Sequence, residues 1–175
     1  MLSKPMIVER AEQPYAAIRA KLAMQEIGRA ADQLAPQLFG WLGAHRIGPA
    51  GAPFFKYNVI DMARQLEIEW GVPTAISIQP DGPVLGGILP AGRYSTLIHR
   101  GPYDGLVDAN AALLKWVADS GLTVDVTQTP AGDKFGCRLE IYLTDPRTEP
   151  DPEKWETEVA FLLADQPESA IVQKP

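Results

Sequence analysis

The stretch Arg138-Leu139-Glu140-Ile141-Tyr142-Leu143 alternates polar and apolar side chains, the pattern of a β-strand with two different faces. Successive side chains of a strand point to opposite sides. The apolar residues therefore share one face, which we interpret as core, while Glu140 lies between Arg138 and Tyr142 on the other. A buried carboxylate without a partner is costly, so Glu140 pairs with Arg138 or a hydroxyl, faces water on an edge strand, or awaits a ligand. We favour the ligand.

Length and composition are those of an ordinary globular domain. The 175 residues are 46% hydrophobic and carry a net charge of −6, and they suffice for one domain or for two half-domains with a common core. No segment reaches the length of a membrane span, and the first residues lack the apolar centre of a secretory signal, so we expect a cytoplasmic protein. The acidic balance argues against direct nucleic-acid binding. Cys137 is the only cysteine, which excludes an intramolecular disulfide.

Hydrophobic periodicity predicts two helices and a series of strands. Apolar residues recur at helical spacing in 24–44, where Pro36 is expected to kink or divide the helix, and in 103–120. Pro14 is expected at an edge, a bulge or a short break. The predicted strands are 6–22, 54–60, 65–72, 84–89, 93–100, 135–144 and 155–164, with 124–129 as a strand or an extended link.

The order strand, helix, strand, strand occurs twice, in halves at about 6–72 and 84–164. Neither half has enough strands to bury its faces alone. We therefore predict an α+β fold in which the duplicated module forms one antiparallel sheet with two helices packed on it. A pseudo-twofold arrangement of this kind leaves a central groove between the helices, where small-molecule sites tend to form. The whole chain, 1–175, is interpreted as a single domain.

Several short motifs spread along the chain resemble the GyrI-like small-molecule-binding family, which also forms the effector-binding half of AraC-type and MerR-type drug-sensing regulators. The clearest are His99-Arg100-Gly101-Pro102-Tyr103 and Leu139-Glu140-Ile141-Tyr142-Leu143. The resemblance implies a ligand cleft at the pseudo-symmetry axis, with an acidic residue of the penultimate strand among aromatic rings. Glu140 matches that acidic position. The other motifs are Gly92-Arg93-Tyr94, Leu114 with Trp116, Asp145-Pro146, and Trp155 with Thr157-Glu158-Val159.

Eight residues are candidates for the ligand site, and each has an alternative structural role. Glu140 is the anchor or else a partner of Arg138, and the aromatic residues line the cleft or else pack in the core. Phe55 and Tyr57 share a face of the predicted strand 54–60. The two histidines, His45 and His99, have no metal-binding spacing, so neither a metal nor a cofactor is expected. The candidates are Glu140, Tyr142, Tyr103, Tyr57, Phe55, Trp41, Trp116 and Trp155.

We therefore expect a protein that senses or sequesters hydrophobic or aromatic small molecules, cationic drugs included, in the manner of a multidrug-binding domain. The alternative is a stand-alone hydrolase, which the resemblance also allows, that opens cyclopropane-containing or other electrophilic genotoxins with Glu140 as its acid or base. A third interpretation, inhibition of a larger partner such as gyrase, rests on the family resemblance alone. No helix-turn-helix segment is evident, so a role in transcription would require a separate DNA-binding partner. A homodimer remains open.

Overall fold

The computed structural model describes residues 1–165. They form two α-helices and ten strands, and the strands make a single curled sheet. The helices are α1 (Ile27–Ala44) and α2 (Leu106–Asp119), and a short 3-10 turn precedes each of them, Met24–Glu26 and Tyr103–Gly105. The strands are β1 (Met6–Arg10), β2 (Gln13–Leu22), β3 (Phe54–Ile60), β4 (Leu66–Pro73), β5 (Val84–Leu89), β6 (Gly92–Arg100), β7 (Val126–Thr129), β8 (Gly132–Phe135), β9 (Arg138–Tyr142) and β10 (Glu156–Leu162).

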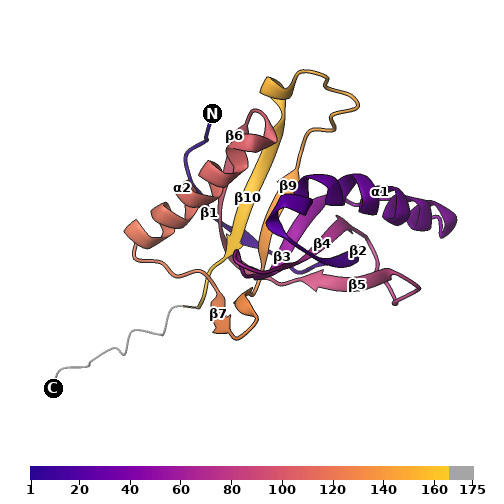
Figure 1. Ribbon diagram of the computed structural model, residues 1–175, viewed down its shortest axis with the longest axis horizontal. Coiled ribbons are helices and arrows are strands. Elements are labelled where there is room, and N and C mark those ends of the chain that lie inside the picture. The colour runs from indigo at the N-terminus through magenta and orange to yellow at the C-terminus, as the bar shows by residue number, and fades with distance from the viewer. Residues whose placement is uncertain (166–175) are drawn as a thin grey trace.

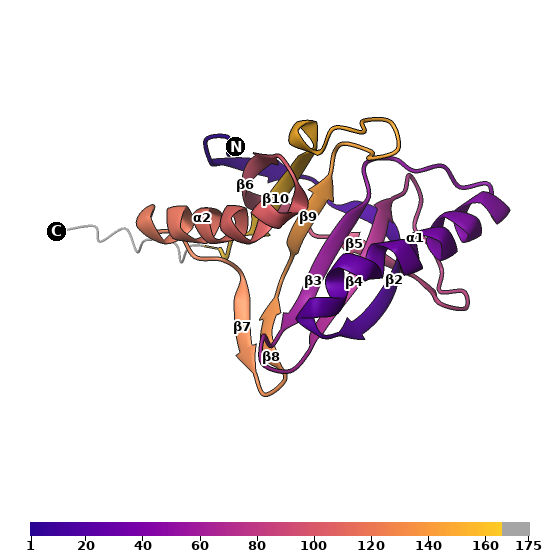
Figure 2. The same cartoon turned by 45° about the horizontal axis from the view of Figure 1, so that its top comes forward.

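The sheet joins the two halves through its central strands. Its order is β1-β6-β10-β9-β3-β4-β2-β5, and the β7–β8 hairpin is attached to β3 through β8. Helix α1 packs on β2 and β4, whereas α2 packs on β6 and β10. Both views place the helices on the same side of the sheet, with β9 and β3 between them (Figures 1 and 2). The predicted α+β fold with a duplicated strand-helix-strand-strand module is therefore confirmed.

Strand alternation produces hydrophobic clusters on both sides of the sheet. On the helix side, Phe55 and Tyr57 of β3 pack with Leu38 and Leu42 of α1, and a matching cluster surrounds α2. On the other side, Phe54 packs with residues of β2, β6, β9 and β10, without any helix. Because this curled sheet buries apolar residues on both faces, its central strands have few positions for solvated side chains.

The observed elements differ from the predicted ones in three places. The segment 6–22 divides into β1 and β2, and Pro14 lies within β2 where that strand begins to pair with β5. The expected strand at 135–144 is interrupted at Gly136, whose amide donates to the carbonyl of Asp125, so β9 begins at Arg138. Pro36 does not divide α1, which is continuous. Within the described residues, no helix is both long enough and apolar enough to cross a bilayer.

Candidate functional site

The Glu140 carboxylate lies on the helix side of β9 and is held by three hydrogen-bond donors. Glu140 is only 7% exposed. Its Oε2 accepts hydrogen bonds from the hydroxyls of Tyr57 (2.9 Å) and Tyr142 (3.0 Å), and its Oε1 accepts one from the side-chain amide of Asn110 on α2 (2.9 Å). All three partners donate, as a carboxylate requires. Strands from both halves and one helix therefore converge on this single side chain.

A partly buried arginine, Arg138, reaches this carboxylate through an amide. Arg138 donates to Oδ1 of Asn110 (3.1 Å), and the same amide donates to Glu140 from its nitrogen. The guanidinium also lies over three rings, those of Tyr57, Phe135 and Phe161. Burial lowers the pKa of Arg138, while the neighbouring tyrosine and carboxylate oppose that change. The network thus contains one charge of each sign, joined by Asn110 and without a direct ion pair among the described residues.

The two tyrosines at the carboxylate remain protonated hydroxyl donors. Burial, and next the charge of Glu140, raises the pKa of Tyr57 and of Tyr142 well above the ordinary tyrosine value. Both effects disfavour a phenolate because it would place a second negative charge in a poorly solvated place. At neutral pH the hydroxyl protons therefore stay available to the carboxylate or to a ligand.

A chain of aromatic rings extends from the buried carboxylate to the surface. Phe55 meets Trp70 edge-on, with ring centres 4.8 Å apart, and both rings approach Tyr142, at 5.9 and 5.6 Å. Tyr142 in turn contacts Tyr103 (5.5 Å), whose ring is tilted by 33° against that of Trp155 (4.7 Å). Separations of this size are those of favourable aromatic pairs. The rings cover the strip of sheet that the two helices leave open.

Burial decreases along this chain of rings toward the solvent. Phe55 and Trp70 are buried, Tyr142 and Trp155 are partly exposed, and Tyr103 is 36% exposed. The buried indole N–H of Trp70 has no hydrogen-bond partner within residues 1–165. Leaving such a donor unpaired costs about 1–3 kcal/mol. The inner part of the ring cluster therefore offers an unused donor next to an apolar surface.

Six of the eight predicted residues lie together in this site, and two lie elsewhere. Glu140, Tyr142, Tyr57, Phe55, Tyr103 and Trp155 are joined by the contacts described above. Trp41, in contrast, stacks on His45 near the end of α1 and donates to Asp81 (2.8 Å), and Trp116 packs on the cluster around α2. Neither of these two indoles takes part in the ring contacts around Glu140 among the described residues.

Two residues of the site were missed by the sequence analysis, although each had a signal. Trp70 follows Leu66 and Ile68 at every second position of β4, which places its ring on the helix side beside Phe55. Asn110 is a polar residue within the apolar stripe of α2. A polar side chain on a buried helix face needs a partner, and here the partners are Glu140 and Arg138.

The fold and this site define an α+β module of two related halves, with a carboxylate among rings where the halves meet. A sequence search among curated proteins finds no match. The family model of the GyrI-like small molecule binding domain matches residues 3–164. The chain therefore belongs to the GyrI-like family, as its motifs suggested.

Three solved structures illustrate the similarity in fold. The EcmrR chain of an EcmrR–DNA complex has a TM-score of 0.70 at 20% identity, over 93% of this chain and 58% of that one; for the EcmrR C-terminal domain alone the values are 0.75 and 19%, over 93% and 98%. SAV2435 bound to tetraphenylphosphonium gives 0.64 at 10% identity, over 93% and 94%. A hydrolase from Listeria innocua gives 0.59 at 17%, over 92% of both chains.

Proposed function

We propose that this protein binds flat, aromatic small molecules between its two halves, with Glu140 as the polar anchor. The observation that carries the proposal is the buried carboxylate held by two tyrosine hydroxyls inside a cluster of rings. Ligand sites are typically apolar and aromatic, with a few polar groups that fix orientation. The role would be to sense or sequester such compounds.

Ligand entry would begin at the exposed end of the ring cluster. Tyr103 and Trp155 lie outermost, and Tyr103 belongs to the short turn that precedes α2. A planar ligand would take the place of these outer rings and stack on Tyr142 and Trp70. The free indole N–H of Trp70 would then gain an acceptor. Ligands that carry an acceptor group on one edge should therefore bind better than pure hydrocarbons.

A positive charge on the ligand would add to this binding. Ring faces attract a cation by roughly 0.5–2 kcal/mol each, and Glu140 adds Coulombic attraction. Arg138 offsets part of that attraction through Asn110. We therefore infer that a neutral aromatic compound and a cation of the same shape bind with affinities that differ by less than about a hundredfold. The bound tetraphenylphosphonium of SAV2435 supports the inclusion of cations.

A hydrolase is the second candidate function. It is favoured by the position of Glu140, a buried carboxylate beside two tyrosine hydroxyls, and by the hydrolase among the structural neighbours. Glu140 would take a proton from a water molecule whose oxygen bonds to a carbon of a strained, electrophilic ring. The ring bond at that carbon breaks, and a tyrosine hydroxyl protonates the atom that receives its electron pair. The substrates would be cyclopropane-containing or similar electrophilic compounds.

One set of variants tests both functions. Intrinsic tryptophan fluorescence is titrated with a planar cationic dye and with a neutral dye of the same ring size, and an electrophilic cyclopropane compound is incubated with the protein while its ring-opened product is measured. The variant is Glu140→Gln. The control is Glu158→Gln, which changes a carboxylate of the adjacent β10 that pairs with Arg10 on the other side of the sheet.

If the protein is a binding protein, Glu140→Gln should lower the affinity for the cationic dye by about tenfold or more and change the affinity for the neutral dye much less. The control should behave like wild type. For a hydrolase, ring opening should disappear in Glu140→Gln alone. Urea unfolding of each variant establishes that it is folded under the assay conditions. Equal affinity of wild type and Glu140→Gln for the cationic dye, together with no turnover by wild type, would refute both.

A further inference from the structure

A second hollow lies on the sheet away from the aromatic cluster and has a different chemical character. It has a volume of about 370 Å³, within the range of roughly 300–1,000 Å³ typical of small-molecule sites. Strands β2, β3 and β4 form it together with the β7–β8 hairpin, which projects below the sheet in Figure 2. We call it the cationic hollow; it is lined by Arg19, Lys56, Asn58, Val59, Glu67, Lys134, Phe135 and Gly136.

The cationic hollow is separated from Glu140 by the sheet. Lys56 lies between Phe55 and Tyr57 in β3, and these two rings point toward the helices, so the lysine points the other way. Its neighbour across β4 is Glu69, which accepts a hydrogen bond from Tyr15 of the helix-free cluster (2.7 Å). A ligand in this hollow would therefore lie across the sheet from Glu140. Phe135 borders the hollow, but its ring lies on the helix side against Arg138.

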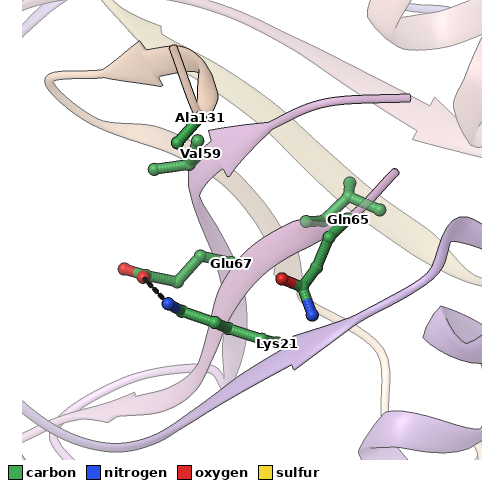
Figure 3. Close-up of a pocket in the computed structure, with 6 residues that line it drawn as sticks. Lys21, Val59, Gln65, Glu67 and Ala131 are labelled. Atoms are coloured by element: carbon green, nitrogen blue, oxygen red, sulfur yellow. Dashed lines mark ion pairs between the residues drawn. The ribbon is translucent and has the colours of Figure 1, made fainter. Parts of the chain in front are cut away.

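Positive charge predominates around the hollow, although the chain as a whole carries −6. A smaller pocket of about 80 Å³ shares Val59 and Glu67 with it and adds Lys21. Figure 3 shows Lys21 reaching across to Glu67, 4.0 Å away. Three carboxylates border this region: those of Glu67, Glu69 and, beside Gly136, Asp125. The cations are four: Arg19, Lys21, Lys56 and Lys134.

Glu69 serves as the fixed internal partner of two of these cations. It is 1% exposed, accepts from Nε and Nη2 of Arg19 (3.2 and 2.7 Å), and lies 3.8 Å from the ammonium of Lys56. Burial by itself would raise the pKa of Glu69, but the charge of Lys56 and the hydrogen bonds from Tyr15 and Arg19 outweigh it and lower the pKa. The carboxylate is thus ionised at neutral pH and holds both cations at the wall of the hollow.

Donors remain unused after these contacts are counted. Lys56 is 13% exposed in its side chain and has its ammonium against Asn58 and Glu69, which leaves one of its three N–H groups free. Arg19 keeps its second terminal nitrogen. Lys134 makes no ion pair with any residue of 1–165. Three partly free cations at one concave surface are the arrangement that binds a carboxylate or phosphate group.

We propose that the cationic hollow binds a small organic anion, with its carboxylate or phosphate between Lys56, Lys134 and Arg19 and its apolar part against Val59. Val59 and the aliphatic chains of the lysines form the wall beside that group, which favours an organic anion over a bare inorganic ion. The protein would then have two ligand sites of opposite charge preference on the two sides of one sheet. This proposal does not depend on the function of Glu140.

Ligand-induced thermal stabilisation and calorimetry test the proposal with four probes: phenyl phosphate, benzoate, inorganic phosphate and benzylammonium. Phenyl phosphate or benzoate should bind the wild type, more tightly than inorganic phosphate, and benzylammonium should not bind at this site. Lys134→Met should lower the affinity for the organic anion by roughly tenfold, as expected for the loss of one charge-assisted hydrogen bond. Lys115→Met is the matched control, because Lys115 lies on the exposed surface of α2 beside Asp119.

The outcomes separate cleanly. Binding that is lost in Lys134→Met, retained in Lys115→Met and unchanged in Glu140→Gln supports the cationic hollow. The proposal is wrong if neither organic anion binds at millimolar concentration, if inorganic phosphate binds as tightly as phenyl phosphate, or if Lys134→Met binds like wild type. Because Lys134 is exposed, the substitution should preserve the fold, which far-UV circular dichroism verifies.

Discussion

The hydrogen bonds to Glu140 can be tested by removing the two tyrosine hydroxyls separately and together. Tyr57→Phe and Tyr142→Phe each delete one donor to Oε2 of the same carboxylate. A hydrogen bond to a charged group contributes about 1.5–3 kcal/mol, against about 0.5–1.5 kcal/mol for a neutral pair. Tyr57 is buried, so its loss should fall in the upper range. Tyr142 is partly exposed, so water can replace its hydroxyl and the loss should be nearer 1 kcal/mol.

The double variant should cost more than the sum of the two single ones. After one substitution, Oε2 still has a donor; after both, a buried carboxylate oxygen has none, which adds an expected coupling of about 0.5–3 kcal/mol. Urea unfolding of the four proteins gives this cycle. Tyr94→Phe is the control, since the Tyr94 hydroxyl donates to the neutral backbone carbonyl of Pro90 (2.7 Å). It should cost about 1 kcal/mol.

Two results would contradict this account of the site. If Tyr57→Phe destabilises no more than Tyr94→Phe, the Tyr57 hydroxyl does not serve a charged acceptor. If the two tyrosine substitutions are additive within about 0.5 kcal/mol, the hydroxyls do not share one oxygen. In either case the carboxylate is not fixed by both halves, and Glu140 loses its claim to be a preorganised anchor.

Two further predictions concern stability. Burial raises the pKa of four tyrosines above the unfolded value of about 10; stability should therefore be intact below that pH and fall above it, by about 1.4 kcal/mol per pH unit for each tyrosine. A rise in absorbance at 295 nm by more than one tyrosine, the exposed Tyr103, before loss of circular dichroism would contradict this. Gly86→Ala should destabilise by about 1–3 kcal/mol or more, because a Cβ there would lie 1.9 Å from the backbone oxygen of Ile78, whereas Gly40→Ala on α1, with open space around it, should raise the melting temperature slightly; equal effects would refute the steric argument. The four tyrosines are Tyr15, Tyr57, Tyr94 and Tyr142.

Alternation along single strands was sufficient to predict much of the site. It placed Phe55 with Tyr57, and Glu140 with Tyr142, each pair on one face, and the repeat of elements placed the two strands in equivalent positions. The register between them, which pairs Phe55 with Glu140, is not a property of either strand. This register depends on how the whole sheet is assembled. The sequence of the two strands therefore did not predict the contact between the Tyr57 hydroxyl and Glu140.

Helices were harder to interpret than strands. Trp41 and Trp116 were candidates because of their residue type. An indole on either helix can reach the central strands β3 and β9 only from a helical turn that faces them. Asn110 is on that turn of α2, and its signal was polarity in an apolar stripe, not aromaticity. Trp70 was overlooked because a tryptophan that follows Leu66 and Ile68 at every second position of a strand resembles ordinary core, and its unpaired N–H is a property of the folded structure alone.

The position of the site follows from the way two incomplete halves share one sheet. Each helix packs mainly on strands of its own half, α1 on β2 and β4 and α2 on β6 and β10, so the helix-side surface of β3 and β9 lies between the two helices. Rings fill that strip, and the equivalent tyrosines of the two halves, Tyr57 and Tyr142, meet at a single oxygen of Glu140 because the pseudo-twofold axis brings them there. One carboxylate on such an axis breaks the symmetry and accepts from both sides. We propose that this shared carboxylate, at the place where the two halves meet, is the polar group that a ligand would engage.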